Sequence, residues 1–268
     1  MSVDYGIAGK KAVITGGSRG IGRACAMALA SQGVEVCITA RRQELLDETA
    51  QQIRDAHGVK VTAISADMSN DEDVRRMVST AEAEMGRIDI LINVAASFPY
   101  GGTLELSNED WIGHFDVKTF GYLRTMRAVH PIMQRNHWGR IVNIAGNASR
   151  VGGGGSAGAV NAAIINMTKG FALDLAKDGI TVNAVHPGGP SDSDREALRI
   201  KEIAHAQGIT EEEAAARQAR NIPPIGRRIV SADPANLVLF LCSMQADCIT
   251  GETLAIDAAS ERDRTVVY

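Results

Sequence analysis

The chain has 268 residues, enough for one large α/β domain with a substantial buried core. Its charge is nearly balanced, with 28 Lys and Arg against 32 Asp and Glu, and it contains no basic run, which argues against a nucleic acid or a membrane surface as partner. The four cysteines are scattered without a CxxC pair, so we expect reduced thiols in the core of a cytoplasmic protein, with no metal site and no disulfide framework. No signal-peptide pattern and no apolar run of membrane-spanning length is evident.

Short apolar runs alternate with longer helical patterns along the chain. Strands are expected at 11–15, 34–40, 60–66, 88–94, 139–145 and 180–186, and the clearest helices at 20–32, 43–57, 156–178 and in the segment 232–259, which also holds a last strand. The strands are apolar along their whole length, as is typical of a parallel sheet with helices on both faces. The alternation therefore predicts an α/β fold with a doubly wound parallel sheet and right-handed crossovers.

Capping signals mark the beginnings of three further helices. Asn70 precedes an acidic first turn. Ser107 with Asp110, and Thr210 with Glu213, match the capping-box pattern, and the first pair opens a long helix through roughly residue 134.

A polar, Ala-rich segment occupies residues 190–222, between the sixth strand and the last helix. It is framed by HPGGP and NIPPIGRR. We expect a helical lid here, so that residues 1–268 form a single domain.

The segment VITGGSRGIG leads a strand into a glycine-rich turn and then into a helix. Glycines allow a pyrophosphate to approach the backbone closely, and the free N–H groups and positive dipole of the helix N-terminus favour the anion. Because this turn follows the first strand of a βαβ unit, it predicts a dinucleotide site. The residues expected to contact the dinucleotide are Gly16, Ser18, Arg19, Gly20, Ile21 and Gly22.

The end of the second strand indicates which dinucleotide is bound. An NAD enzyme normally places an acidic residue there for the ribose diol, but this chain has Ala40 followed by Arg41 and Arg42. A guanidinium makes bidentate, charge-assisted bonds with a ribose 2′-phosphate, and Arg19 lies nearby in the glycine turn. NADP(H) is therefore preferred over NAD(H), with the alternative that Arg41 and Arg42 are a solvated pair at a helix start.

The glycine spacing and several later segments resemble the classical short-chain dehydrogenase/reductase family along most of the chain. Asp67 and Met68 resemble its adenine-contacting pair, Asn93 and Ala95 in NVAA stand where it has Asn-Asn-Ala-Gly, and Pro187 and Gly188 resemble its turn beneath the nicotinamide. The resemblance implies a Rossmann-type domain that binds a small-molecule substrate. It also implies a homodimer or homotetramer in which helices 107–134 and 156–178 pack against their copies.

The residues that this family uses for catalysis are replaced here. NAAIINMTKGFALDLA resembles the family pattern KAAVxxxTKxLAxELA, which places Asn161 at the family lysine and Ala157 at the family tyrosine. IVNIAG places Gly146 near the catalytic serine, and WIGHFDVKTFG places Lys118 at the family asparagine. The sequence has no tyrosine at all between residues 123 and 267.

The lysine and the asparagine have thus exchanged places. In the family fold these side chains approach each other beneath the nicotinamide ribose, so the resemblance implies that Lys118 and Asn161 are both candidate catalytic and cofactor-binding residues. In the alternative, Lys118 points to solvent and Asn161 only caps or spaces a loop. The proton that a tyrosine would carry could come from Lys118, if burial lowers its pKa, from the substrate or from water.

Other polar residues near the ends of the fourth, fifth and sixth strands are weaker candidates for substrate contacts or local packing. They are Tyr100, Asn147, Ser149, Arg150, Ser156 and His186.

Together these patterns predict an NADP(H)-dependent oxidoreductase with a non-standard active site, which acts on a small carbonyl or alcohol in the manner of a 3-oxoacyl reductase. A nucleotide-binding pseudoenzyme, serving as a sensor or partner subunit, is the alternative. A lyase- or dehalogenase-like activity fits least, because such variants of the family generally keep the tyrosine.

Overall fold

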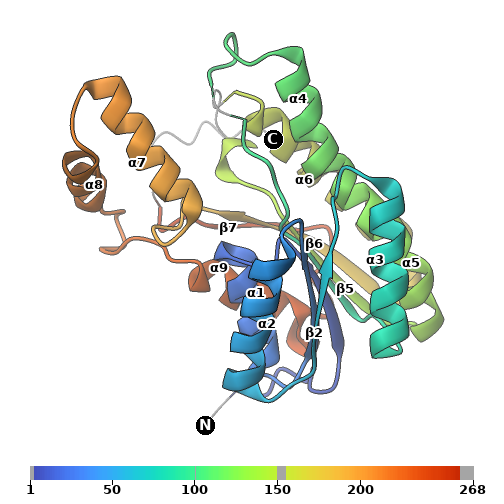
Figure 1. Ribbon diagram of the computed structural model, residues 1–268. Helices are drawn as coiled ribbons and strands as arrows, with labels where there is room; N and C mark the ends of the chain where they lie inside the picture. Colours follow the sequence, from blue (N-terminus) through green and yellow to red (C-terminus); the bar gives the residue numbers. More distant parts are fainter. Residues whose placement is uncertain (1–2, 100, 150–154, 260–268) are drawn as a thin grey trace.

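A seven-stranded parallel sheet forms the centre of the computed structural model, which describes residues 3–99, 101–149 and 155–259 (Figure 1). The strand order is β3-β2-β1-β4-β5-β6-β7. The strands are β1 (Lys11–Thr15), β2 (Glu35–Ala40), β3 (Val61–Ser65), β4 (Ile90–Asn93), β5 (Gly139–Ile144), β6 (Ile180–Pro187) and β7 (Thr253–Ile256). The predicted doubly wound Rossmann-type sheet is confirmed, and the first six strands lie within two residues of their expected ends.

The winding direction reverses between β1 and β4, which are neighbours in the sheet although two strands separate them in sequence. Ala12, Val13 and Ile14 of β1 pair with Ile90, Leu91 and Ile92 of β4. In such sheets the crevice at the carboxyl ends of these strands is the usual ligand site. Every residue of β4 and β5 is buried, because helices cover both faces of the sheet.

Two layers of helices enclose the sheet. One layer contains α1 (Gly20–Ala30), α2 (Gln43–His57) and α9 (Ala232–Cys242), whose apolar residues share a core cluster with β1 and β2. The other contains α3 (Asp71–Met85), α5 (Gly121–Asn136) and α6 (Ala157–Leu175), which pack on the opposite face (Figure 1). Within the described part of the chain, no helix has the length and apolar character that crossing a membrane requires.

The long helix predicted from Ser107 to about residue 134 is interrupted. It comprises α4 (Asn108–His114), a π-helical segment (Phe115–Phe120) and α5, which ends at Asn136. The wider turn carries Lys118 and turns its side chain inward, so that only 3% of this lysine is exposed. A π-helical turn inside an α-helix is rare and occurs frequently at functional sites.

The segment predicted as a lid forms two helices, α7 (Asp194–Gln207) and α8 (Glu211–Arg220), which pack against each other. They extend from the sheet on the left of Figure 1, across from α4. All three predicted helix caps are present: Asn70 accepts two backbone hydrogen bonds, and the Ser107 and Thr210 capping boxes are both formed. Of the four cysteines, three are buried as expected, whereas Cys248 is exposed.

Candidate functional site

The glycine turn after β1 is compact enough that side chains would not fit. Gly16 has a φ of +67°, and a Cβ there would lie 3.0 Å from the backbone of Ala95. A Cβ on Gly22 would lie 2.1 Å from the carbonyl oxygen of Gly16. Gly20 has a φ of +52° and faces open space, so the turn leaves room at the N-terminus of α1. Ser18 and Ile21 complete the turn, where the Ser18 carbonyl accepts a hydrogen bond from Thr49 Oγ1 at 3.0 Å.

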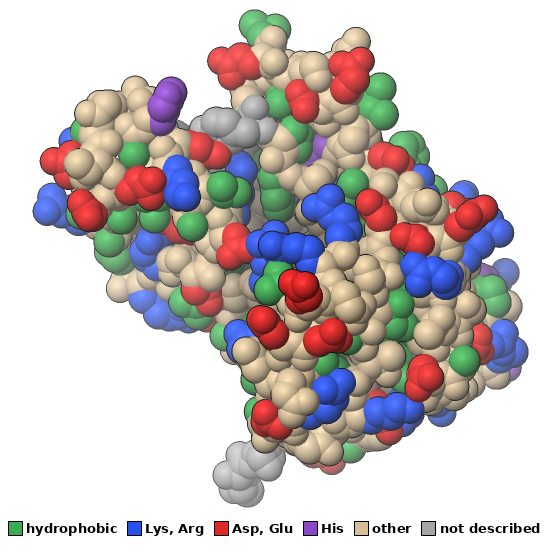
Figure 2. Space-filling model, viewed as in Figure 1, with side chains coloured by type: hydrophobic (Ala, Val, Ile, Leu, Met, Phe, Trp, Pro, Cys, Tyr) green, Lys and Arg blue, Asp and Glu red, His purple; other side chains and the backbone are tan. Residues whose placement is uncertain are grey.

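Three arginines follow the first two strands. Arg41 and Arg42 come directly after β2 and are exposed. Arg19 precedes α1 and forms an ion pair with Asp194, the first residue of α7. This contact between the glycine turn and the segment 190–222 was not predicted. Figure 2 shows Lys and Arg side chains gathered just above the start of α1, beside a hollow that separates the α7–α8 arm from the rest of this face.

Asp67 and Met68 follow β3. The Asp67 Oδ1 atom accepts hydrogen bonds from the Ser69 amide at 2.9 Å and from Ser69 Oγ at 2.7 Å, which fixes the carboxylate at the edge of the sheet. Met68 is buried, with its backbone and Cβ packed against Gly121 at the start of α5. Met68 therefore connects the segment after β3 to the start of α5.

The side chain of Asn93 points into the protein. Its Nδ2 donates to Asn143 Oδ1 at 2.9 Å, its Oδ1 accepts from Thr125 Oγ1 at 2.8 Å, and the residue is fully buried. Asn93 thus ties β4 to β5 and α5, and only its backbone can face a bound dinucleotide. Ala95 lies beside Gly16, and its amide bonds to Thr15 Oγ1 at 3.2 Å.

Lys118 and Asn161 meet at the carboxyl end of β5. The Lys118 Nζ atom donates to Asn161 Oδ1 at 2.7 Å and to the Ala145 carbonyl at 3.2 Å. Both side chains are buried, with 3% and 5% of their surfaces exposed. The predicted proximity is confirmed, and the alternative in which Lys118 points to solvent is wrong.

Burial lowers the pKa of Lys118 to about 7. Its two hydrogen-bond acceptors, a side-chain amide oxygen and a backbone carbonyl oxygen, are both neutral. They stabilise the ammonium less than a carboxylate would, so desolvation dominates. Near neutral pH both the ammonium and the amine form of Lys118 are therefore populated.

Gly146 lies directly against Asn161. A Cβ at residue 146 would be 2.8 Å from Asn161 Nδ2, so the amide occupies the space that a side chain would need. The Gly146 carbonyl accepts from Ser149 Oγ at 2.8 Å and lies 3.0 Å from His186 Nδ1. Ser149 and His186 thus pack locally. Asn147 begins a short 3₁₀ turn, and its Oδ1 is buried without a hydrogen bond among the described residues.

Pro187 is the last residue of β6, and Gly188 follows it beside β7. The Gly188 amide donates to the Ile256 carbonyl at 2.7 Å, and a Cβ at this position would lie 2.4 Å from Ile229 Cδ1. This close packing fixes the turn at the carboxyl ends of the strands, where Gly16 also lies.

Tyr122 lies one helical turn beyond Lys118, but it does not replace the missing tyrosine. Its hydroxyl donates to the Ile144 carbonyl at 3.1 Å, the residue is 1% exposed, and burial raises its pKa well above the ordinary value. A phenol in this setting neither gives nor takes a proton near neutrality. The sequence candidates Tyr100 and Arg150 lie outside the described residues.

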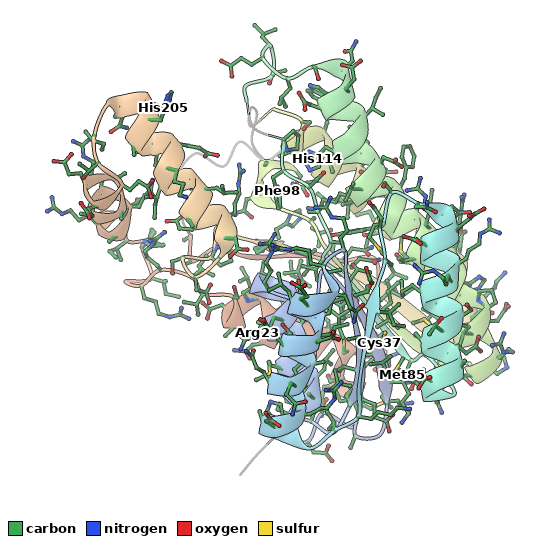
Figure 3. The ribbon with its side chains drawn as sticks, viewed as in Figure 1. Arg23, Cys37, Met85, Phe98, His114 and His205 are labelled. Atoms are coloured by element: carbon green, nitrogen blue, oxygen red, sulfur yellow. The ribbon has the colours of Figure 1, made fainter. Side chains whose placement is uncertain are left out.

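His114 was missed by the sequence analysis. It ends α4, is 2% exposed, and its Nδ1 lies 2.8 Å from Ser156 Oγ, the residue before α6. Its ring meets Phe98 edge-to-face with centroids 6.1 Å apart, as Figure 3 shows. The spacing of His114 and Lys118 on one helix was the available signal. Their shared partner, α6, could not be placed from the sequence.

Comparison with known proteins identifies the family of the chain. A family model described as enoyl-(acyl carrier protein) reductase matches residues 16–258. The NADPH-dependent reductase BacG of Bacillus subtilis is 31% identical over 258 residues, covering 94% of this chain and 97% of the relative. The 3-oxoacyl-(acyl-carrier-protein) reductase FabG of Staphylococcus aureus is 32% identical over 251 residues, covering 92% and 96%.

Among solved structures, L-sorbose reductase from Gluconobacter frateurii in complex with NADPH and L-sorbose superimposes with a TM-score of 0.90. It is 28% identical, and the match covers 97% of this chain and 100% of the reductase. The range matched by the family model covers most of the chain, from the glycine turn to the last strand, and the relatives cover more than nine tenths of it. The chain therefore belongs to the classical short-chain dehydrogenase/reductase family.

Proposed function

We propose that the protein is an NADP(H)-dependent oxidoreductase that interconverts a small carbonyl compound and its alcohol through a non-standard proton-carrying group. The observation that carries this proposal is the buried hydrogen bond from Lys118 Nζ to Asn161 Oδ1 at 2.7 Å. It places a titratable group at the carboxyl ends of the strands, where the glycine turn also lies. Known reductases among the relatives support the same reaction class.

The residues around the glycine turn fit a phosphorylated dinucleotide. A Cβ at Gly16 or Gly22 would collide with neighbouring backbone atoms, whereas a Cβ at Gly20 would meet open space. Arg41 and Arg42 would hold the 2′-phosphate. The residues assigned to the rest of the cofactor are Ser18, Arg19, Ile21, Asp67, Met68, Asn93, Ala95, Lys118, Asn161, Pro187 and Gly188. NADPH, when bound, supplies the hydride.

Lys118 carries the proton in this proposal. When a carbonyl is reduced, its oxygen gains a proton, and the Lys118 ammonium loses one to become an amine; in alcohol oxidation the transfer is reversed. A pKa of about 7 keeps both forms populated at neutral pH. Asn161 Oδ1 and the Ala145 carbonyl orient Nζ by accepting its hydrogen bonds.

Two measurements on Lys118→Ala test this proposal. NADPH binding is followed by fluorescence titration, and turnover by NADPH consumption over a panel of small ketones and aldehydes. We expect the rate to fall by about a hundredfold or more, typical for loss of a general acid, with only a modest loss of NADPH affinity. Lys201→Ala, an exposed lysine on α7, is the control and should behave as the wild type.

Tight NADPH binding without turnover of any carbonyl in the wild type would contradict an oxidoreductase and favour a nucleotide-binding sensor. If Lys118→Ala and Asn161→Ala change neither affinity nor rate, the exchange of the two residues has no functional meaning.

We also propose that the described helices and sheet form one domain, and that copies associate through α5 and α6 into a dimer or tetramer.

A further inference from the structure

His114 has one ring nitrogen engaged and one free. Nδ1 contacts Ser156 Oγ at 2.8 Å, whereas Nε2 is buried and has no hydrogen-bond partner among the residues that the structure describes. An unsatisfied buried nitrogen costs about 1–3 kcal/mol, so native proteins keep few of them. Nothing in the reaction proposed above uses this atom.

An aromatic ring and a cation lie near His114. The guanidinium carbon of Arg195, in the first turn of α7, lies 5.3 Å from the centre of the Phe98 ring. The same Phe98 ring contacts the ring of His114, so Phe98 lies between the arginine and the histidine. Phe98 is half exposed and Arg195 is exposed. Arg195 forms no ion pair in the described chain, whereas its neighbour Asp194 is paired with Arg19.

The charges that act on His114 are positive. Burial first, and then the charges of Lys118 and Arg195, lower its pKa to about 4. The imidazole is therefore neutral near pH 7, and the two neighbouring positive charges favour a ligand that brings negative charge.

From these contacts we propose that His114, Phe98 and Arg195 form a substrate subsite for a small oxo- or hydroxycarboxylate. Arg195 pairs with the carboxylate, Phe98 covers the carbon chain, and His114 Nε2 hydrogen-bonds an oxygen of the substrate. The inference rests on the proposed function, because it names the substrate class of the same site. The subsite is adjacent to the Lys118–Asn161 pair, since both pairs join the α4–α5 helix to α6.

The His114–Ser156 contact suits both directions of the reaction. If Ser156 donates its hydroxyl proton to Nδ1, then Nε2 carries a hydrogen and donates to a carbonyl oxygen. If Nδ1 donates to Ser156 Oγ, then Nε2 accepts from a substrate hydroxyl. The serine hydroxyl permits either tautomer without moving the ring, and no proton leaves the pair in this binding role.

Matched probes test the subsite. Pyruvate and acetoacetate are compared with ethyl pyruvate and ethyl acetoacetate, which differ mainly by loss of the charge. We measure kcat/KM from NADPH consumption, and binding by calorimetry with the full chain saturated with NADP⁺. The wild type is expected to prefer each acid over its ester, and Arg195→Gln to lower kcat/KM and affinity for the acids by about tenfold or more, with less than about a twofold change for the esters.

Arg199→Gln, an exposed arginine on the same helix, controls for a general loss of charge and should keep the preference. His114→Gln retains a polar atom and should keep part of the acid binding, whereas His114→Leu should lose it for acids and esters alike. Thermal unfolding of each variant shows whether the fold is retained, and Ser156→Ala provides a second, milder change if His114→Leu does not fold.

The outcomes separate the two proposals. Acid binding that depends on Arg195 but occurs without turnover supports the subsite and contradicts the oxidoreductase. Turnover of neutral ketones with no preference for acids, unchanged in Arg195→Gln and His114→Leu, overturns the subsite and leaves the oxidoreductase standing.

Discussion

The buried pair at the end of β5 allows a direct test of how its environment sets the pKa of Lys118. Asn161→Asp replaces the neutral acceptor 2.7 Å from Nζ by a carboxylate of nearly the same shape. At this distance and an effective dielectric constant of about 20, the attraction is about 6 kcal/mol before the cost of burying the carboxylate. At 1.36 kcal/mol per pKa unit this sets an upper limit of about 4 units, and charge partners in proteins usually shift a pKa by about 1–3 units.

We therefore expect the pKa of Lys118 to rise from about 7 to between about 8 and 10 in Asn161→Asp. The measurement is the pH titration of the Lys118 Cε resonance by NMR, assigned by its absence in Lys118→Met. It requires neither turnover nor cofactor. Where turnover occurs, the pH dependence of kcat/KM should move in the same direction.

Asn161→Leu is the matched control, because it removes the acceptor without adding a charge and should lower the pKa of Lys118 further. If the titration midpoint stays near 7 in both variants, the contact between Nζ and Oδ1 does not control this lysine. The proton-carrying role would then lose its physical basis.

Three other changes give independent tests. Gly22→Ala, whose Cβ would lie 2.1 Å from the Gly16 carbonyl, should abolish NADPH binding in a fluorescence titration, whereas Gly113→Ala, with open space around it, should bind normally and unfold at a slightly higher temperature. Between pH 7 and 10.5 folded Lys118 binds fewer protons than the unfolded residue, so the free energy of unfolding of the wild type should rise with pH. Chemical denaturation at several pH values should show a rise that is up to about 4 kcal/mol larger in the wild type than in Lys118→Met. Leu173→Glu, at an α6 position that is 83% exposed, should shift the mass measured by light scattering to a smaller species; an unchanged mass would exclude this face from subunit contacts.

The elements of the fold were predictable because the strands are continuous apolar runs and because α3, α4 and α8 begin at recognisable capping residues. The pairing of Lys118 with Asn161 also followed from the sequence, through the register of two helices relative to a known family. The π-helical segment could not be predicted, since Phe115–Phe120 continues the apolar periodicity of the helices around it. Only the hydrogen-bond pattern distinguishes such a turn from ordinary α-helix.

Contacts across long stretches of sequence were the other failure. His114 contacts Ser156 across a glycine-rich segment whose path the sequence does not determine. Arg19 was assigned to the cofactor from its place in the glycine turn, and its additional ion pair with Asp194 was not predicted. Such contacts depend on where α7 lies over the sheet, which local patterns do not specify.

The packing of Gly146 against the amide of Asn161 also constrains how this protein can evolve. A Cβ at residue 146 would lie 2.8 Å from Asn161 Nδ2, so any side chain there requires the Asn161 amide to shift. Because the oxygen of the same amide accepts the hydrogen bond from Lys118 Nζ, such a shift disturbs that contact. A substitution at residue 146 therefore also changes the surroundings of the Lys118 ammonium, although residue 146 does not touch the lysine through a side chain of its own.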